Sequence, residues 1–243
     1  MTTDTPIRTA IVIGASGGIG NALFDAWLDN DAIDHVIGIS RQDSDKHSDR
    51  SRWIRTDYST EAIEQVCDQL ADKHFEIHRV CICNGILHDG DIWPEKKIEE
   101  LDMLKLQELY RINCLIPMTW IQHLLPVIKG KHDCTVSVIS ARIGSIQDNR
   151  SGGWYGYRAS KAALNMMLKT AAIEFARRAK NVKLMAIHPG TTDTNLSHPF
   201  QQNIKYEINT PQHVANSMVG LMEAAEIDGT ASYLDWEGVP IEW

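Results

Sequence analysis

The feature that most limits how this chain can fold is a glycine-rich run between two apolar segments. Residues 9–13 have the composition of a buried strand, and residues 19–28 have the spacing of apolar side chains typical of a helix. The run Gly-Ala-Ser-Gly-Gly-Ile-Gly, from Gly14 to Gly20, connects them. Glycine has no β-carbon, so it allows both a tight turn and a close approach of the backbone to other atoms. The run therefore predicts a strand, a sharp turn and a helix as the first unit of the fold.

The alternation of strand and helix continues along the rest of the chain. Apolar runs of strand length predict strands at 35–39, 53–56, 79–83, 135–140, 182–187 and 232–236. Helical spacing predicts helices at 61–71, 98–127, 157–178 and 212–225. Pro117 should bend or divide the longest of them, because proline lacks a backbone donor and clashes with the preceding turn. Strands and helices that alternate in this way predict a parallel sheet covered by helices on both faces.

Composition narrows the classes of partner. The 243 residues include 24 basic and 32 acidic side chains, which gives a net charge of −8, and no dense block of Lys and Arg. A nucleic-acid surface needs clustered positive charge, so we expect no nucleic-acid partner. The N-terminal residues lack a signal-peptide pattern, and no apolar stretch is long enough to span a bilayer. We therefore expect a cytoplasmic protein with no membrane partner.

The cysteines and histidines predict neither a disulfide framework nor a metal site. The five cysteines are odd in number and include no Cys-x-x-Cys pair. The ten histidines show no metal-ligand spacing such as His-x-x-x-His, so we predict no metal.

The glycine run also predicts a nucleotide site. Backbone amides at the start of a helix can approach a pyrophosphate closely when side chains are absent, and the helix dipole favours the anion. The residues expected to line this contact are Gly14, Ser16, Gly18, Ile19 and Gly20. The alternative is a glycine-rich turn that only changes the direction of the chain.

The end of the second predicted strand should select the cofactor. A carboxylate there accepts hydrogen bonds from a ribose 2′-hydroxyl, whereas a cation suits a 2′-phosphate. This chain has Ser40 and Arg41 at that position and no carboxylate until Asp43. NADP(H) is therefore preferred, with NAD(H) possible, unless Arg41 is only a solvated loop residue.

A candidate pair for proton transfer lies on the predicted helix 157–178. Tyr157 and Lys161 are four residues apart, which places them on one helix face, one turn from each other. A cation beside a phenol lowers the phenol pKa, and a phenol with a lowered pKa can exchange a proton with a substrate oxygen. The alternative is a surface pair on an ordinary helix.

Together these segments resemble the short-chain dehydrogenase/reductase family, in its single-domain branch, and within it the C-factor-like and small carbonyl reductase group. Nearly the whole chain carries the motifs in the family's order. They are Gly14, Gly18 and Gly20 of the cofactor motif, Asp57 at the adenine-binding aspartate, Asn113 at the active-site asparagine, Tyr157 with Lys161, and residues 188–194 over the nicotinamide. The resemblance implies a Rossmann-type α/β fold, with one doubly wound parallel sheet in a three-layer α/β/α domain that spans residues 1–243.

The resemblance also implies roles for individual residues. Tyr157 would be the general acid or base, and Lys161 would lower its pKa and hold the nicotinamide ribose. Asn113 would hold a water of the proton relay, or it would instead satisfy backbone groups freed by the interrupted helix. Further cofactor contacts are expected from Ser40, Arg41, Asp57, Asn84, Gly85, Pro189, Gly190, Thr191 and Thr194. Segment 191–206 is expected to form a lid over the substrate.

Two departures from the family pattern affect these expectations. The sequence Ile-Cys-Asn-Gly at 82–85 replaces Asn-Asn-Ala-Gly, so a polar pair that braces the sheet is absent. The family's catalytic serine position falls on Ala141. Ser140, one residue earlier, is our expected substitute if the strand end is bent, and Ser145 is the alternative.

The function implied is an NADP(H)-dependent oxidoreductase that moves a hydride between nicotinamide and a small carbonyl or secondary alcohol substrate. Family members pair through long helices, so a homodimer or homotetramer is implied, and apolar residues at 101–125 permit it. Two other classes stay open: a nucleotide-binding signalling protein of C-factor type with little or no turnover, and a structural subunit that binds no nucleotide.

Overall fold

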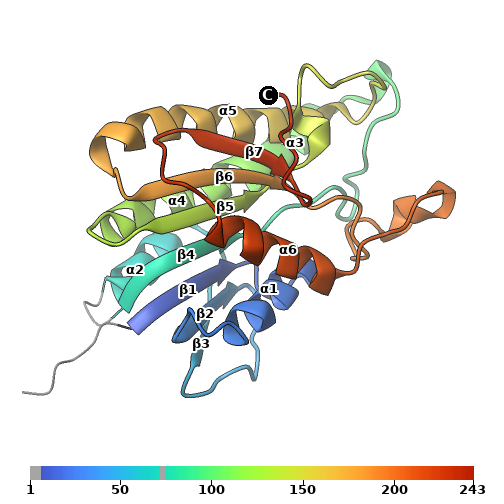
Figure 1. Ribbon diagram of the computed structural model, residues 1–243. Coiled ribbons are helices and arrows are strands. Elements are labelled where there is room, and N and C mark those ends of the chain that lie inside the picture. The colour runs from blue at the N-terminus through green and yellow to red at the C-terminus, as the bar shows by residue number, and fades with distance from the viewer. Residues whose placement is uncertain (1–6, 72–74) are drawn as a thin grey trace, which may run out of the picture.

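A seven-stranded sheet forms the centre of the computed structural model, which describes residues 7–71 and 75–243 (Figure 1). Its strands are β1 (Ile7–Ile13), β2 (His35–Ser40), β3 (Ser51–Arg55), β4 (Phe75–Ile82), β5 (Cys134–Ile139), β6 (Val182–His188) and β7 (Ala231–Asp235). All six neighbouring pairs are parallel, in the order β3-β2-β1-β4-β5-β6-β7. The predicted parallel sheet is therefore confirmed.

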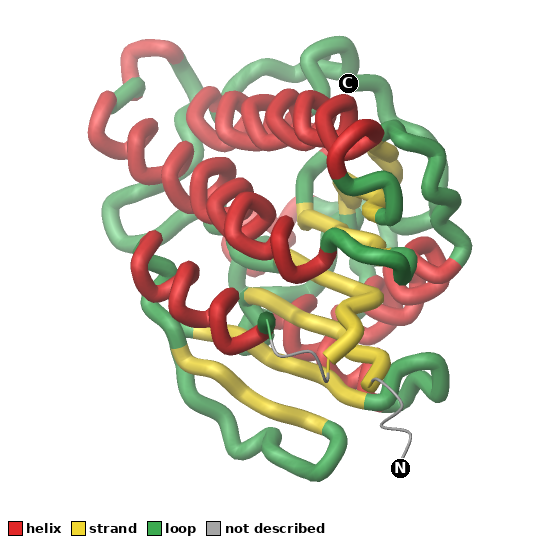
Figure 2. The backbone as a smooth tube through the Cα atoms, turned by 90° about the vertical axis from the view of Figure 1, so that its left-hand side faces the viewer, coloured by secondary structure: helices red, strands yellow, loops and turns green. Residues whose placement is uncertain are grey.

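Helices cover both faces of this sheet, as Figure 2 shows. They are α1 (Gly18–Leu28), α2 (Thr60–Leu70), α3 (Met103–Tyr110), α4 (Ile116–Ile128), α5 (Tyr155–Arg178) and α6 (Pro211–Glu223). One apolar core lies between the sheet and α2, α4 and α5, and includes Ile11 and Trp120. A second lies under α1 and α6 and includes Phe24 and Met218. These three layers are the expected Rossmann-type, doubly wound α/β/α domain.

The strand order places a crevice at the centre of the sheet. The chain runs outward from β1 to β3 and then returns to β4 on the other side of β1. In open α/β sheets, ligands bind beyond the carboxyl ends of the strands where the order reverses in this way. The glycine run follows β1 and residues 83–88 follow β4, so both lie at this crevice.

The predicted helix 98–127 is divided earlier than expected. Residues 98–100 form a 3₁₀ turn, and α3 begins at Met103 because Asp102 caps its first amides. A π-helical turn, Arg111–Leu115, then separates α3 from α4, so the interruption precedes Pro117 instead of occurring at it.

Pro117 nevertheless explains the unusual turn. The amide of Ile116 donates to the carbonyl of Arg111, one residue further back than in an α-helix. Pro117 has no amide to donate to the next carbonyl, that of Ile112. The side-chain Nδ2 of Asn84 donates to this carbonyl instead, at 3.2 Å. Asn84 therefore links the end of β4 to the interrupted helix.

All five cysteines are free thiols. Within the ranges that the structure describes, no helix is long and apolar enough to cross a bilayer.

Candidate active site

The glycine run forms a tight turn against the end of β2. The amides of Gly14 and Ala15 both donate to the carbonyl of Ile39, at 2.8 and 3.1 Å. Gly14 has a φ of +79°, and a β-carbon on Gly20 would lie 2.2 Å from the Gly14 oxygen, so larger residues would disrupt the turn. Helix α1 begins directly after Gly17, which supplies no side-chain cap. Its first amides therefore remain available to an anion.

Two adjoining cavities, of about 310 and about 170 Å³, extend from this turn. Both are lined by the glycine turn and the segment after β4. Arg41 and Asp57 line the smaller cavity, and Tyr157, Lys161 and Thr194 line the larger one. The cleft thus has an end that holds Arg41 and Asp57, a turn rich in free amides, and an end at α5. This layout fits a dinucleotide, with adenosine at β2, pyrophosphate at α1 and nicotinamide at α5.

The predicted adenosine residues lie together at the end of β2 and in the loop after β3. Ser40 Oγ donates to Ser16 Oγ at 2.6 Å, and Arg41 is exposed at the rim of the smaller cavity. The Asp43 carboxylate forms an ion pair with Arg55 at 3.4 Å. A hydrogen bond from the Ser59 amide, at 2.8 Å, lowers the pKa of Asp57 and keeps it a carboxylate.

Asn84 and Gly85 lie at the centre of the cleft. Asn84 Oδ1 is buried and has no hydrogen-bond partner among the described residues, so a ligand hydroxyl could donate to it. A β-carbon on Gly85 would lie 3.2 Å from Asn113 Oδ1 and 3.4 Å from Lys161 Nζ. Gly85 therefore lets the segment after β4 approach both predicted catalytic side chains.

Asn113 is fully buried in the π-helical turn. Its Oδ1 accepts from the Ile86 amide at 2.7 Å, and its Nδ2 donates to the Ile86 carbonyl at 2.8 Å and to Ser160 Oγ at 3.1 Å. The side chain thus fixes the loop after β4, which is a structural role.

Tyr157 and Lys161 lie one turn apart at the start of α5, as predicted, and both are buried. Lys161 Nζ lies 5.9 Å from the centre of the Tyr157 ring and donates to the Ile139 carbonyl at 2.9 Å. Burial raises the pKa of the Tyr157 phenol well above its usual value and lowers the pKa of Lys161 to about 8. The direction for Tyr157 is opposite to the one predicted from the pair, because desolvation outweighs the nearby cation.

Neither candidate serine directs its hydroxyl to Tyr157. Ser140 Oγ donates to Asn165 Oδ1 at 2.6 Å, and Ser145 Oγ accepts from the Asp148 amide at 3.1 Å. Ala141 packs in one apolar cluster with Tyr157. The residue at the family's serine position therefore presents a methyl group to the tyrosine.

A larger cavity, of about 550 Å³, opens on the other side of Tyr157. Aromatic rings from three loops line or flank it. Phe200 lies 5.1 Å from Trp154 and 6.1 Å from Trp93 between ring centres, and His88 stacks on Trp93 at 5.1 Å. Trp154 in turn meets Tyr157 edge-on at 6.4 Å. The cavity suits an apolar ligand with aromatic groups.

His188, at the end of β6, is a polar residue of this cavity that the sequence reasoning missed as a candidate. Burial, more than the nearby Arg142, lowers the pKa of His188 to about 4, so the ring is neutral at physiological pH. Its Nδ1 is buried and has no partner within the described residues. The sequence feature that could have identified His188 is its position directly before Pro189 and Gly190.

The segment after β6 borders both the cleft and this apolar cavity. Pro189, Gly190 and Thr191 line the apolar cavity, and Thr194 lines both. The methyl group of Thr194 occupies the space where a β-carbon of Gly18 would lie, at 2.6 Å. The predicted residues 189–194 are therefore brought against the start of α1.

The chain is similar to several known proteins. A sequence profile described as short chain dehydrogenase matches residues 8–205. The chain is 25% identical over 185 residues to 1-hydroxy-2-glutathionyl-2-methyl-3-butene dehydrogenase of Rhodococcus sp., over 76% of each chain. It is 26% identical over 251 residues to benzil reductase ((S)-benzoin forming) of Bacillus cereus, over 90% of this chain and 96% of that protein. It is 25% identical over 144 residues to the C-signal of Myxococcus xanthus, over 59% of this chain and 82% of that protein.

Two solved structures share the fold over 98% of this chain and 100% of theirs. Carbonyl reductase Sniffer of D. melanogaster superposes with a TM-score of 0.83 at 18% identity. A protein from Burkholderia multivorans, described as a short-chain dehydrogenase/reductase with bound NADP, superposes with a TM-score of 0.81 at 25% identity. Since the profile covers most of the chain and the relatives include dehydrogenases and reductases, the protein belongs to the short-chain dehydrogenase family and is an NAD(P)-dependent oxidoreductase.

Proposed function

We propose that this protein uses NADPH to reduce the carbonyl group of small substrates that carry aromatic or other bulky apolar groups, and that it catalyses the reverse oxidation of the secondary alcohol. The observation that carries the proposal is the position of Tyr157, which lines both the dinucleotide cleft and the apolar cavity. Among the side chains that line both, Tyr157 is the one that can act as an acid or a base. A carbonyl in the apolar cavity would therefore lie between a bound nicotinamide and this phenol.

In this mechanism a bound nicotinamide would supply the hydride, and the protein supplies orientation and the proton. Tyr157 donates its proton to the substrate oxygen, and burial keeps that phenol protonated at neutral pH. Lys161 holds the cofactor ribose with the ammonium protons that do not bond Ile139. Leu87 and Ala141, which pack with Tyr157, exclude water from the reacting face.

Three further roles follow from the contacts. Asn113 fixes the loop after β4, and a water beside its backbone would continue the proton path from Lys161. Ser140 acts as a positioning residue through Asn165, because its hydroxyl is already engaged there. The neutral ring of His188 supplies a hydrogen bond to the substrate in place of the usual serine.

Cofactor preference is assigned to Arg41. It lines the adenosine end of the cleft with Asp57, and the nearest carboxylate after β2, Asp43, is paired with Arg55. A guanidinium there suits a 2′-phosphate. The Burkholderia multivorans protein with bound NADP supports the same choice.

Segment 191–206 forms one wall of the apolar cavity and would close over the substrate. Large apolar side chains are exposed at Leu115 in the π-helical turn and on α5, where Met166 and Ile173 are seven residues apart and share one helix face. We assign this face to a homodimer or homotetramer, which sedimentation would detect and which Met166→Lys should weaken.

Turnover measured against a substrate panel tests this function. The purified protein would be mixed with NADPH and with aryl ketones, 1,2-diketones, quinones and short aliphatic ketones, while NADPH absorbance is followed. We expect turnover that is fastest with the aromatic carbonyls, as the name of the Bacillus cereus relative suggests. NADPH binding without turnover of any carbonyl would favour the second candidate, a nucleotide-binding signalling protein, to which the similarity to C-signal and the missing serine point.

A further inference from the structure

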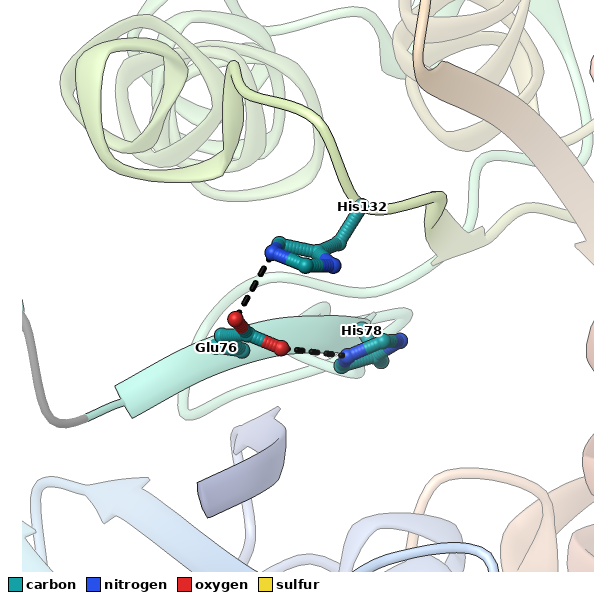
Figure 3. Close-up of side chains that lie close together, drawn as sticks. All are labelled: Glu76, His78 and His132. Carbon is teal, nitrogen blue, oxygen red and sulfur yellow. Dashed lines mark ion pairs between the residues drawn. The ribbon is translucent and has the colours of Figure 1, made fainter. Parts of the chain in front are cut away.

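Three side chains with metal-binding atoms meet at the edge of the sheet opposite the active site. Glu76 and His78 lie on β4 near its amino end, and His132 lies in the loop between α4 and β5 (Figure 3). Their ligand atoms all lie within 4.8 Å of one another. The cavities described above do not include them, so this cluster is separate from the proposed reaction site.

Of the two contacts that Glu76 makes in the cluster, one is short and the other is long. One oxygen of Glu76 lies 2.7 Å from His132 Nε2, and the other lies 3.6 Å from His78 Nε2. The second distance is too long for a hydrogen bond. His78 Nε2 is buried and has no hydrogen-bond partner among the described residues, although it faces the carboxylate. A buried polar atom without a partner calls for an explanation.

The backbone holds the three residues in place without help from a ligand. Glu76 and His78 are two residues apart on β4, where the pairing with β1 shifts at His78, and both side chains lie near His132 (Figure 3). The loop that carries His132 is tied down by Asn181, whose Nδ2 donates to the Ile128 carbonyl at 2.9 Å and to the His132 carbonyl at 2.7 Å. Asn181 Oδ1 also accepts from the Gly130 amide at 3.1 Å. The site is therefore largely preorganised.

Among the described residues, the ion-pair contacts of Glu76 are with the two histidines alone. The residue that pairs with Glu76 across β1 and β4 is Arg8, and its guanidinium is engaged with Asp34 at 3.1 Å. Arg79, a second cation near the cluster, donates to the His78 carbonyl at 2.9 Å. Glu76 therefore faces two imidazoles in a pocket whose side chains are 20% to 51% exposed.

We propose that Glu76, His78 and His132 form a binding site for Zn²⁺ or a similar first-row divalent ion. Two imidazole nitrogens and one carboxylate are a donor set that zinc uses, with water as the fourth ligand. Ligand atoms around tetrahedral zinc lie about 3.3 Å apart, so the Glu76–His78 distance already suits the ion. The two histidines contact different oxygens of Glu76, so binding one ion requires side-chain rotation, for which the half-exposed His132 has room. The bound ion would clamp the loop after α4 to the start of β4.

Calorimetry on the full chain, produced without an affinity tag and freed of metal by a chelator, tests the site. Titration with Zn²⁺ should give one ion per chain with a Kd of about 10 µM or tighter, equivalent to about −7 kcal/mol. Mg²⁺, which prefers oxygen ligands, should not bind. Zn²⁺ should also raise the melting temperature by several degrees, because it binds the folded chain.

Variants decide whether these three residues hold the ion. His132→Ala and His78→Gln should each weaken Zn²⁺ binding by at least about tenfold. His123→Ala removes a histidine of α4 outside the cluster and should bind as the wild type does. His132 is half exposed, so His132→Ala should fold and turn over NADPH like the wild type; this keeps the test valid if His78→Gln is unstable. Absence of saturable binding, or equal binding by wild type and His132→Ala, would overturn the proposal.

Discussion

The ammonium of Lys161 lies 5.9 Å from the centre of the Tyr157 ring, and both side chains are buried against the end of β5. Burial disfavours the charged form of each group, so the pair favours a neutral phenol and a weakly held lysine proton. A neutral phenol is the form required to protonate a substrate oxygen during carbonyl reduction. The same burial makes Lys161 a cost to stability.

Lys161→Met should stabilise the protein in the absence of nucleotide. The pKa of Lys161 is about 8 in the fold and 10.5 ordinarily, so between these values the unfolded chain binds more protons. Wild-type stability should therefore rise with pH across that window, and below it the buried ammonium costs free energy. We expect the free energy of unfolding of Lys161→Met near neutral pH to exceed that of wild type by about 1 to 3 kcal/mol, with loss of the pH slope. Urea unfolding at several pH values measures the free energy of unfolding and its slope with pH. Lys180→Met, at an exposed lysine, is the control. Equal slopes in Lys161→Met and wild type would contradict the prediction.

Ser140→Ala should affect stability more than turnover. The substitution leaves Asn165 without its donor in a buried site, which should cost about 1 to 3 kcal/mol of unfolding free energy. We expect kcat to stay within about threefold of wild type, because the Ser140 hydroxyl is bonded to Asn165 and gives no hydrogen bond to the substrate in the transition state. Chemical denaturation and steady-state kinetics on the same preparation separate the two effects. A large loss of kcat with unchanged stability would return Ser140 to the substrate-holding role implied by the family.

His188→Leu should lower kcat by about 10- to 100-fold, because a hydrogen bond to the developing oxyanion is lost. His188→Gln, which keeps a donor, should recover part of that loss. NADPH affinity should be unchanged in both, since His188 lines the apolar cavity and not the dinucleotide cleft. Identical kcat in His188→Leu and wild type would remove this residue from the mechanism.

Arg41→Ala should reduce the preference for NADPH over NADH. A charge-assisted hydrogen bond is worth about 1.5 to 3 kcal/mol, so the Kd for NADPH should rise by about 10- to 100-fold while that for NADH stays the same. Fluorescence titration with both nucleotides measures this, with Arg177→Ala as a control for the change in net charge. A wild-type protein that prefers NADH would contradict the cofactor assignment.

The parts of the fold and site that follow from local spacing could be predicted from the sequence. The glycine turn and the pair on α5 depend on residues that are close in the chain, and the structure places both where the spacing predicts. The position of the π-helical turn could not be predicted in this way, because a proline indicates a break in a helix but not which carbonyls lose their donors. Here Asn84, from another part of the chain, donates to the Ile112 carbonyl that Pro117 leaves without a donor.

The remaining features depend on contacts between distant segments. The direction of Ser140 is set by how β5 ends in the turn at Arg142–Gly144, where Gly144 packs directly on Lys161. The pKa of Tyr157 depends on burial, which spacing does not reveal. His132 is far from Glu76 and His78 in the chain, so no motif spacing indicated that the three meet.

The rate of carbonyl reduction by Tyr157→Phe tests the central claim most directly. Phenylalanine keeps the ring that packs with Ala141 and Leu87 but removes the proton that the mechanism requires. With a substrate that the wild type reduces, we predict a kcat at least about 100-fold lower and a Kd for NADPH within about twofold of wild type. A Tyr157→Phe protein that reduces the same carbonyl at a rate close to wild type would contradict the assignment of Tyr157 as the proton donor.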